Sequence, residues 1–169
     1  MIKTLEGLHE HLQWALELEH STIPPYLCAL YSIKPKTNIE AFEVIHSIFI
    51  EEMLHMALVA NIAIATGCNL KLDYPEFMPN YPSPLPHSDK SFLVNLESFS
   101  RDAVATFMKI ERPANENAEA MEEGFSSIGQ FYKSIEDALI YLSDDLGEAV
   151  LFSGKPEHQI TAASTYYGG

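Results

Sequence analysis

The stretch VIHSIFIEEMLHMALVANIAIA, residues 44–65, decides the fold. It is almost wholly apolar, and its length and spacing predict a helix. Glu52 and His55 interrupt the apolar stripe, and side chains three positions apart lie on one face of a helix. That face also carries most of the large apolar side chains, so we expect it to be buried: Ile45, Ile48, Phe49, Met56, Val59 and Ile62.

A buried carboxylate without a partner is unstable, so a cationic side chain or a metal ion is expected beside Glu52. Glu-x-x-His in a helix interior is also how carboxylate-bridged di-iron bundles present their ligands.

Length and composition indicate one domain over residues 1–169. The chain has 169 residues, 47% of them hydrophobic, and a domain of this size buries roughly 70% of its unfolded surface. Neither a metal nor a disulfide is therefore required for folding. Cys28 and Cys68 form no CxxC pair and no secretory signal is recognisable, which predicts a soluble, cytoplasmic protein.

The formal net charge of −14 bears on the partners. Nucleic acids and anionic membranes bind through clusters of lysine and arginine. We therefore expect neither as a partner.

The predicted order of elements is two helices, a long loop, two helices and a tail. The first helix should span residues 5–31, kinked or split at Pro24-Pro25, and Thr37 with Glu40 should form a capping box that opens the second helix, which ends at Gly67. Five prolines within residues 69–90 predict a long crossover. The remaining ranges are 93–110 and 127–142 for the third and fourth helices, and 143–169 for an irregular tail with at most one short helix at 146–152.

Helical register adds a third candidate ligand. Glu19 lies on the apolar face of the first helix, whereas Glu17 lies on a polar face. Two antiparallel helices joined by a short loop would bring Glu19 close to Glu52. Two carboxylates and one imidazole, from Glu19, Glu52 and His55, suit iron or manganese. The alternative is that these acids form buried hydrogen bonds or pair with Arg101 or Arg112, the only arginines in the chain.

Other polar residues have weaker support. His9 and His11 are expected in solvent, and His20 lies at the flank of the apolar face, where a hydrogen bond to a ligand is as plausible as no role. Glu111 could reach the core, but a surface ion pair with Arg112 is the favoured interpretation. Glu136 is expected to be half-buried, and Gln130 lies among polar residues.

Several strings together resemble a known family. They are LQWALELEHSTIPPYLCALYSI, VIHSIFIEEMLHMALVANIAIATG, YPEFMPNYPSPLP, FMKIERP and SIGQFYKSIEDAL. They are similar to the ferritin-like domain associated with the iminophenyl-pyruvate dimer synthases of violacein and rebeccamycin biosynthesis, which also occurs as stand-alone bacterial proteins. The resemblance implies an all-α, ferritin-like four-helix bundle with a carboxylate-bridged metal site, in which Glu19 matches the acid of the first helix and Glu52 with His55 match the pair of the second.

Two departures from the family pattern concern the second half of such a site. Relatives tend to carry an acid at the position of Gln130, and they continue beyond the equivalent of residues 166–169 into further helices with another Glu-x-x-His. This chain is therefore a short member or part of a longer polypeptide. A complete two-metal site cannot be assembled from its residues, which leaves a mononuclear, weak or vacant site.

Two functional hypotheses follow. The first is an iron-dependent oxidoreductase, with manganese as the alternative metal, acting on a small amino-acid-derived metabolite of bacterial secondary metabolism. The second is a non-catalytic bundle with a degenerate site that acts in binding or assembly. Four helices leave apolar surface uncovered, so a homodimer is expected under either hypothesis.

Overall fold

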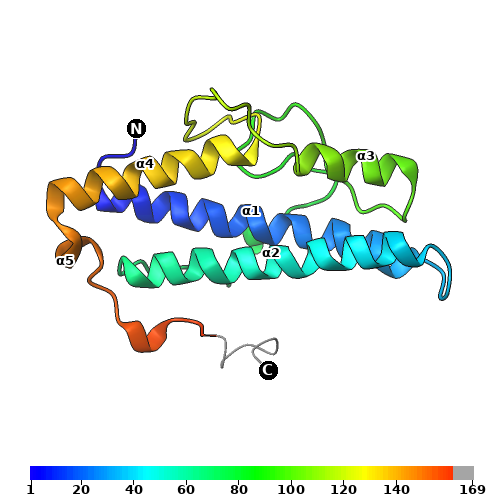
Figure 1. Cartoon of the computed structure of the whole chain (residues 1–169), viewed down its shortest axis with the longest axis horizontal. Helices are drawn as coiled ribbons and strands as arrows, with labels where there is room; N and C mark the ends of the chain where they lie inside the picture. The colour runs from blue at the N-terminus through cyan, green and yellow to red at the C-terminus, as the bar shows by residue number, and fades with distance from the viewer. Residues whose placement is uncertain (162–169) are drawn as a thin grey trace.

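The first two helices form a long antiparallel hairpin in a computed structural model that describes residues 1–161. Helix α1 spans Leu5–Ser32 and α2 spans Ile39–Ala65, and the two lie side by side along their length (Figure 1). The hydroxyl of Thr4 caps α1 by accepting a hydrogen bond from the Gly7 amide at 3.1 Å. This hairpin carries all three predicted metal ligands.

The prolines of α1 do not divide the helix, so the expected split is wrong. Pro24 and Pro25 both lie inside one continuous helix. Because Pro25 has no N–H, the carbonyl of Ser21 loses its helical donor. The hydroxyl of Tyr81, from the crossover, donates to that carbonyl at 2.6 Å instead. The proline thus creates an attachment point for the crossover.

The predicted capping box at the start of α2 is also wrong. Asn38 precedes the helix in a left-handed conformation with φ of +47° and makes no side-chain cap. The Thr37 hydroxyl instead donates to the Lys34 carbonyl at 2.7 Å, and Asn38 rather than Thr37 occupies the N-cap position. The tight turn between the helices therefore determines where α2 begins.

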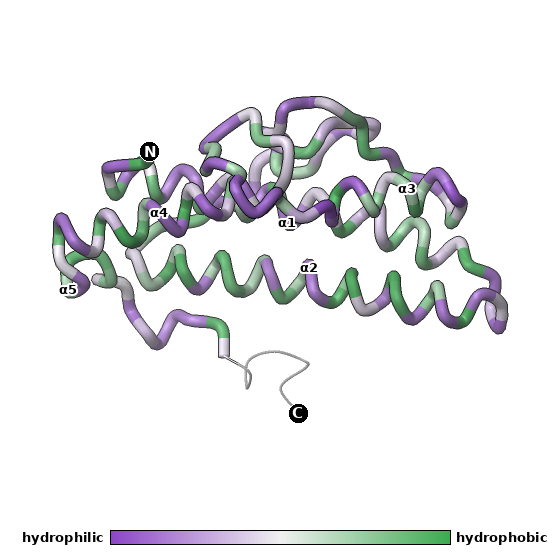
Figure 2. Tube along the Cα trace, turned by 45° about the horizontal axis from the view of Figure 1, so that its top comes forward, coloured by the Kyte–Doolittle hydropathy of each residue, from purple (hydrophilic) through white to green (hydrophobic). Residues whose placement is uncertain are grey.

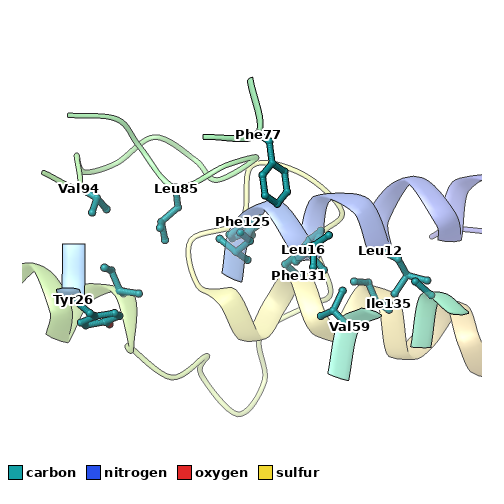
Figure 3. Packing of buried hydrophobic residues seen from close by; sticks show 14 of the residues in the cluster. Leu12, Leu16, Tyr26, Val59, Phe77, Leu85, Val94, Phe125, Phe131 and Ile135 are labelled. Atoms are coloured by element: carbon teal, nitrogen blue, oxygen red, sulfur yellow. The ribbon is translucent and has the colours of Figure 1, made fainter. Parts of the chain in front are cut away.

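The crossover between α2 and α3 packs onto the hairpin, as the aromatic residues in it suggested. It contains the short 3₁₀ helix η1, Pro75–Phe77, and an antiparallel bridge in which Ser83 and Val94 exchange two backbone hydrogen bonds of 3.0 and 2.8 Å. The side chains of Phe77, Leu85 and Val94 are buried against the hydrophobic core (Figure 3).

The second pair of helices is displaced from its predicted bounds. Helix α3 covers only Arg101–Ile110, because residue 94 is held in the bridge and the Ser100 hydroxyl caps the helix by accepting from the Ala103 amide at 3.1 Å. Helix α4 is longer than predicted, Ile128–Leu146. The described part of the tail contains α5, Glu148–Leu151, and the 3₁₀ helix η2, Pro156–His158, while residues 162–169 of the predicted tail lie outside the described residues.

The elements form three rows. Helix α1 lies between α2 and α4 and packs on both, and α3 continues the row of α4 in both views (Figures 1 and 2). Side chains from α1, α2 and α4 meet in the core, including Leu12, Leu16, Val59, Phe131 and Ile135 (Figure 3). Among the described elements, α1 is the main neighbour of α2. Much of the α2 surface that faces away from α1 is therefore uncovered.

Helix α2 is unusually apolar for its exposure. Its most apolar window of 18 residues has a mean hydropathy of 1.7, yet only 17% of that window is buried. By length and composition alone α2 could cross a membrane, a criterion that the core helix of a soluble protein also meets. Figure 2 shows α2 as a separate row rich in hydrophobic positions.

The tail returns to the end of α2 at a contact that permits only glycine. The Gly154 amide donates to the Ala65 carbonyl at 2.9 Å, and a Cβ atom on Gly154 would lie 1.7 Å from the Ile64 carbonyl oxygen.

We expect Gly154→Ala to lower the free energy of unfolding by about 1–3 kcal/mol, because the backbone at this contact must move. Urea unfolding measures this, with Ser153→Ala as the neighbouring control. Equal stability of the two variants would contradict the described docking.

Candidate metal centre

The three predicted ligands meet in space. Glu19 from α1 and Glu52 and His55 from α2 each offer one ligand atom, and these atoms all lie within 4.8 Å of one another. The His55 Nδ1 atom is 3.4 Å from Glu19 Oε2 and 3.9 Å from Glu52 Oε1. The hairpin geometry that the sequence predicted therefore produces the predicted cluster.

Glu19 is held by a residue that sequence reasoning missed. Its side chain is buried, and its Oε1 atom accepts a hydrogen bond from the hydroxyl of Tyr132 on α4. Burial, followed by the Glu19 charge, raises the pKa of Tyr132, so this tyrosine remains a hydrogen-bond donor. Tyr132 is 113 positions from Glu19, and nothing in its local sequence indicated the contact.

Glu52 is also buried and is held by α1. The Thr22 hydroxyl lies 2.5 Å from Glu52 Oε2 and 2.7 Å from the Glu19 backbone carbonyl. A hydroxyl has one proton and can donate to only one of these acceptors at a time. When Thr22 donates to the carbonyl, only a protonated Glu52 can complete the second contact. Thr22 is three positions from Glu19, so both lie on one face of α1, and this spacing is the sequence signal that indicates the contact.

Burial raises the pKa of the Glu52 carboxyl to about 8, against the opposing effect of the Thr22 hydrogen bond, and the nearby carboxylates of Glu19 and Glu111 raise it further. His55 shifts in the matching direction, because its hydrogen bond to Glu19 raises the imidazole pKa. The site thus favours an added positive charge, whether a proton or a metal ion.

In the described part of the chain, no lysine or arginine forms an ion pair with these acids. Among residues 1–161 the ion-pair partner of both Glu19 and Glu52 is His55 alone. The predicted pairing with Arg101 or Arg112 is therefore wrong for the described structure. The other alternative, buried hydrogen bonds, is present as the contacts of Tyr132 with Glu19 and of Thr22 with Glu52.

The cluster opens into a cavity of about 460 Å³ between α2 and the α3–α4 connection. Its walls are mostly apolar, and the lining residues beyond the three ligands are Leu58, Val59, Ile62, Ile110, Glu111, Arg112, Pro113, Ala114, Ile128, Gly129 and Tyr132. An apolar cavity beside a few polar groups is typical of a small-molecule site.

Glu111 belongs to this cavity, contrary to the favoured prediction of a surface ion pair with Arg112. Its Oε1 atom accepts a hydrogen bond from the hydroxyl of Tyr26, whose side chain is fully buried on α1. Burial, then the bond to Glu111, raises the Tyr26 pKa, so Tyr26 donates this bond. A third carboxylate is thereby fixed at the cavity wall, beside those of Glu19 and Glu52.

The other candidates lie elsewhere. The Gln130 Oε1 atom accepts from the Ser126 amide and hydroxyl at the start of α4, and Glu136 is exposed rather than half-buried. His20 stacks on Phe77 with ring centroids 4.3 Å apart, and burial lowers its imidazole pKa. None of the three joins the cluster.

The two N-terminal histidines are not solvated as predicted. His11 is buried, and its Nδ1 atom contacts the Gly7 carbonyl at 2.7 Å. His9 Nε2 contacts the Thr66 carbonyl at 2.9 Å, which ties the start of α1 to the end of α2. Long-range packing that the local sequence does not encode covers both rings.

The donor set fits a metal ion. Two carboxylate oxygens and one imidazole nitrogen, with no lysine or arginine paired to them among residues 1–161, are suited to iron or manganese, and three protein ligands leave positions for other groups. The raised Glu52 pKa is a further observation in favour, since a divalent ion can replace the proton.

Comparison with known proteins agrees with the fold. A family described as Ferritin-like matches residues 12–169. A crystal structure of a ferritin-like protein from Caulobacter vibrioides is similar at a TM-score of 0.72 and 31% sequence identity over 84% of this chain. The present chain spans about half of that protein, 55% of its length. No curated protein matches. With a match over nearly its whole length, the chain belongs to the Ferritin-like family.

Proposed function

We propose that this protein binds iron, or manganese in its place, through Glu19, Glu52 and His55, and that the loaded site oxidises a small molecule in the adjoining cavity. The observation that carries the proposal is the pair of buried carboxylates beside an imidazole with no lysine or arginine partner in the described residues. Iron bound there would supply one-electron and dioxygen chemistry.

The surrounding residues have defined tasks in this proposal. Tyr132 orients the Glu19 carboxylate and Thr22 orients that of Glu52, so both ligands are held before a metal arrives. The apolar walls contributed by α2 and α4 limit water near the reacting molecule. Glu111, fixed by Tyr26, is placed to accept or return a proton at the cavity wall.

The substrate class and setting extend the proposal. The resemblance to the domain associated with iminophenyl-pyruvate dimer synthases supports an amino-acid-derived metabolite as substrate, and the apolar cavity is compatible with one. Two free cysteines support a reducing, cytoplasmic location. Residues 1–169 would act as one domain.

Metal binding is tested first by removing one ligand. We expect Glu52→Ala to bind Mn(II), and Fe(II) without oxygen, more than about 100-fold more weakly than the wild type, since losing even an outer contact costs 10–100-fold. Titration calorimetry measures the affinity, and circular dichroism checks the fold. Glu136→Ala, an exposed acid on α4, should bind like the wild type.

Elemental analysis of wild-type protein purified without chelator completes this test. Wild-type protein that contains no metal and takes up neither ion would contradict the proposal and favour a non-catalytic bundle that acts in binding or assembly.

The raised Glu52 pKa predicts a pH effect on the metal-free protein. The folded carboxyl titrates near 8 and the unfolded one near 4.5, so between these values the native state holds more protons. The contribution of Glu52 to stability is therefore full below pH 4.5 and is lost as the pH rises to 8. We expect Glu52→Gln to gain stability relative to the wild type by roughly 3–4 kcal/mol from pH 5 to pH 8.

Urea unfolding at several pH values in chelator measures this difference. Glu136→Gln is the control, and its stability should follow the wild type at every pH. A difference between Glu52→Gln and the wild type that stays constant with pH would contradict the assignment.

A further inference from the structure

One side of α2 carries a regular stripe that the rest of the fold covers only in part. Its residues alternate in spacing between four and three positions, which is the pattern of a helix that pairs with another helix. They are Val44, Ile48, Glu51, His55, Leu58 and Ile62. Val44 and Leu58 are 52% and 51% exposed, and the His55 side chain is 47% exposed.

Two hollows follow this stripe along α2. The metal-site cavity contains His55, Leu58 and Ile62, and a second hollow of about 490 Å³ contains Val44 and Ile48. Residues of α3 and of the segments beside it form the opposite wall of the second hollow, and Glu111 lines both. We call these two adjoining hollows the groove, and the stripe beside them, residues 44–62, is about 27 Å long.

The stripe is complementary to itself when reversed. In an antiparallel pair of α2 helices with the two-fold axis at residue 53, Val44 lies opposite Ile62 of the partner subunit and Ile48 opposite Leu58 of the partner subunit. The same register places Glu51 opposite His55 of the partner subunit. Every apolar residue thus meets an apolar one, and the two polar residues meet each other.

We propose that a second copy of this chain covers the groove through antiparallel α2–α2 pairing, and that Glu51 of the partner subunit binds His55. The His55 Nδ1 atom faces Glu19 and Glu52, whereas its Nε2 atom has no hydrogen-bond partner among residues 1–161. A histidine that binds metal almost always donates its other ring N–H to a carboxylate, a backbone carbonyl or water. The partner's Glu51 supplies that carboxylate.

A lipid bilayer fits this face less well than a second copy. The stripe carries an acid and an imidazole at its centre, where burial in hydrocarbon is most costly. Pairing in the register described leaves neither group unpartnered. Only the Glu51–His55 contact rests on the proposed metal site, because the apolar pairing stands without it.

Sedimentation velocity of the whole chain over a concentration series tests the pairing. The wild type should form a species of twice the chain mass of 18.9 kDa. Val44→Glu and Leu58→Glu should each raise the dimer dissociation constant by at least about 100-fold, because each change occurs twice in the interface. Met53→Glu, on another face of α2, should dimerise normally.

A wild-type monomer, or dimers that tolerate both stripe variants, would overturn the proposal. A monomer would leave the groove to a helix of a longer polypeptide, and a chain that sediments with phosphatidylcholine vesicles through this face would assign it to lipid. Circular dichroism establishes that each variant is folded.

The Glu51 contact is tested with Mn(II) by calorimetry. Glu51→Gln should remain dimeric and bind Mn(II) about 10–100-fold more weakly, as expected for loss of a carboxylate behind a histidine ligand. Monomeric Val44→Glu, distant from the ligands in sequence, should show the same loss. Wild-type affinity in monomeric Val44→Glu would overturn the contact between subunits. A wild-type dimer that binds no Mn(II) would contradict the metal site and leave the pairing intact.

Discussion

Two carboxylates, Glu19 and Glu52, are buried between α1 and α2. Contacts with the surrounding side chains offset the free-energy cost of removing them from water. Tyr132 brings α4 to one acid, Thr22 supports the other, and His55 lies between them. An apolar pair would have packed the same helices at less electrostatic cost. Their burial without a lysine or arginine partner among residues 1–161 is the observation on which the proposed metal site rests.

The hairpin and its cluster could be predicted because they depend on local rules. Helical register identified Glu19, Glu52 and His55, and a short connection between two long helices brought them together. The partners of these residues were harder to predict. Tyr132 comes from the last long helix, and Glu111 is fixed by a tyrosine 85 positions away, so only the tertiary fold determines either contact.

Two of the wrong predictions, the start of α3 and the capping box of α2, share a cause. The sequence around residue 93 has helical spacing, but a β-bridge at Val94 holds it extended until Ser100 can cap α3. Thr37 and Glu40 have the spacing of a capping box, but the turn before α2 uses the Thr37 hydroxyl elsewhere. In both places a contact outside the predicted helix outweighs the local pattern. Gln130, which departs from the family pattern, likewise serves the start of α4.

Pro25 connects the cluster of Glu19, Glu52 and His55 to the crossover. The carbonyl that it frees on Ser21 is taken by Tyr81, and Ser21 directly precedes Thr22, the residue that holds Glu52. The same helical turn of α1 therefore supports Glu52 through Thr22 and anchors the crossover through Ser21. Release of the loop from Ser21 would disturb the same turn that supports Glu52, so the two should lose order together, as one cooperative unit.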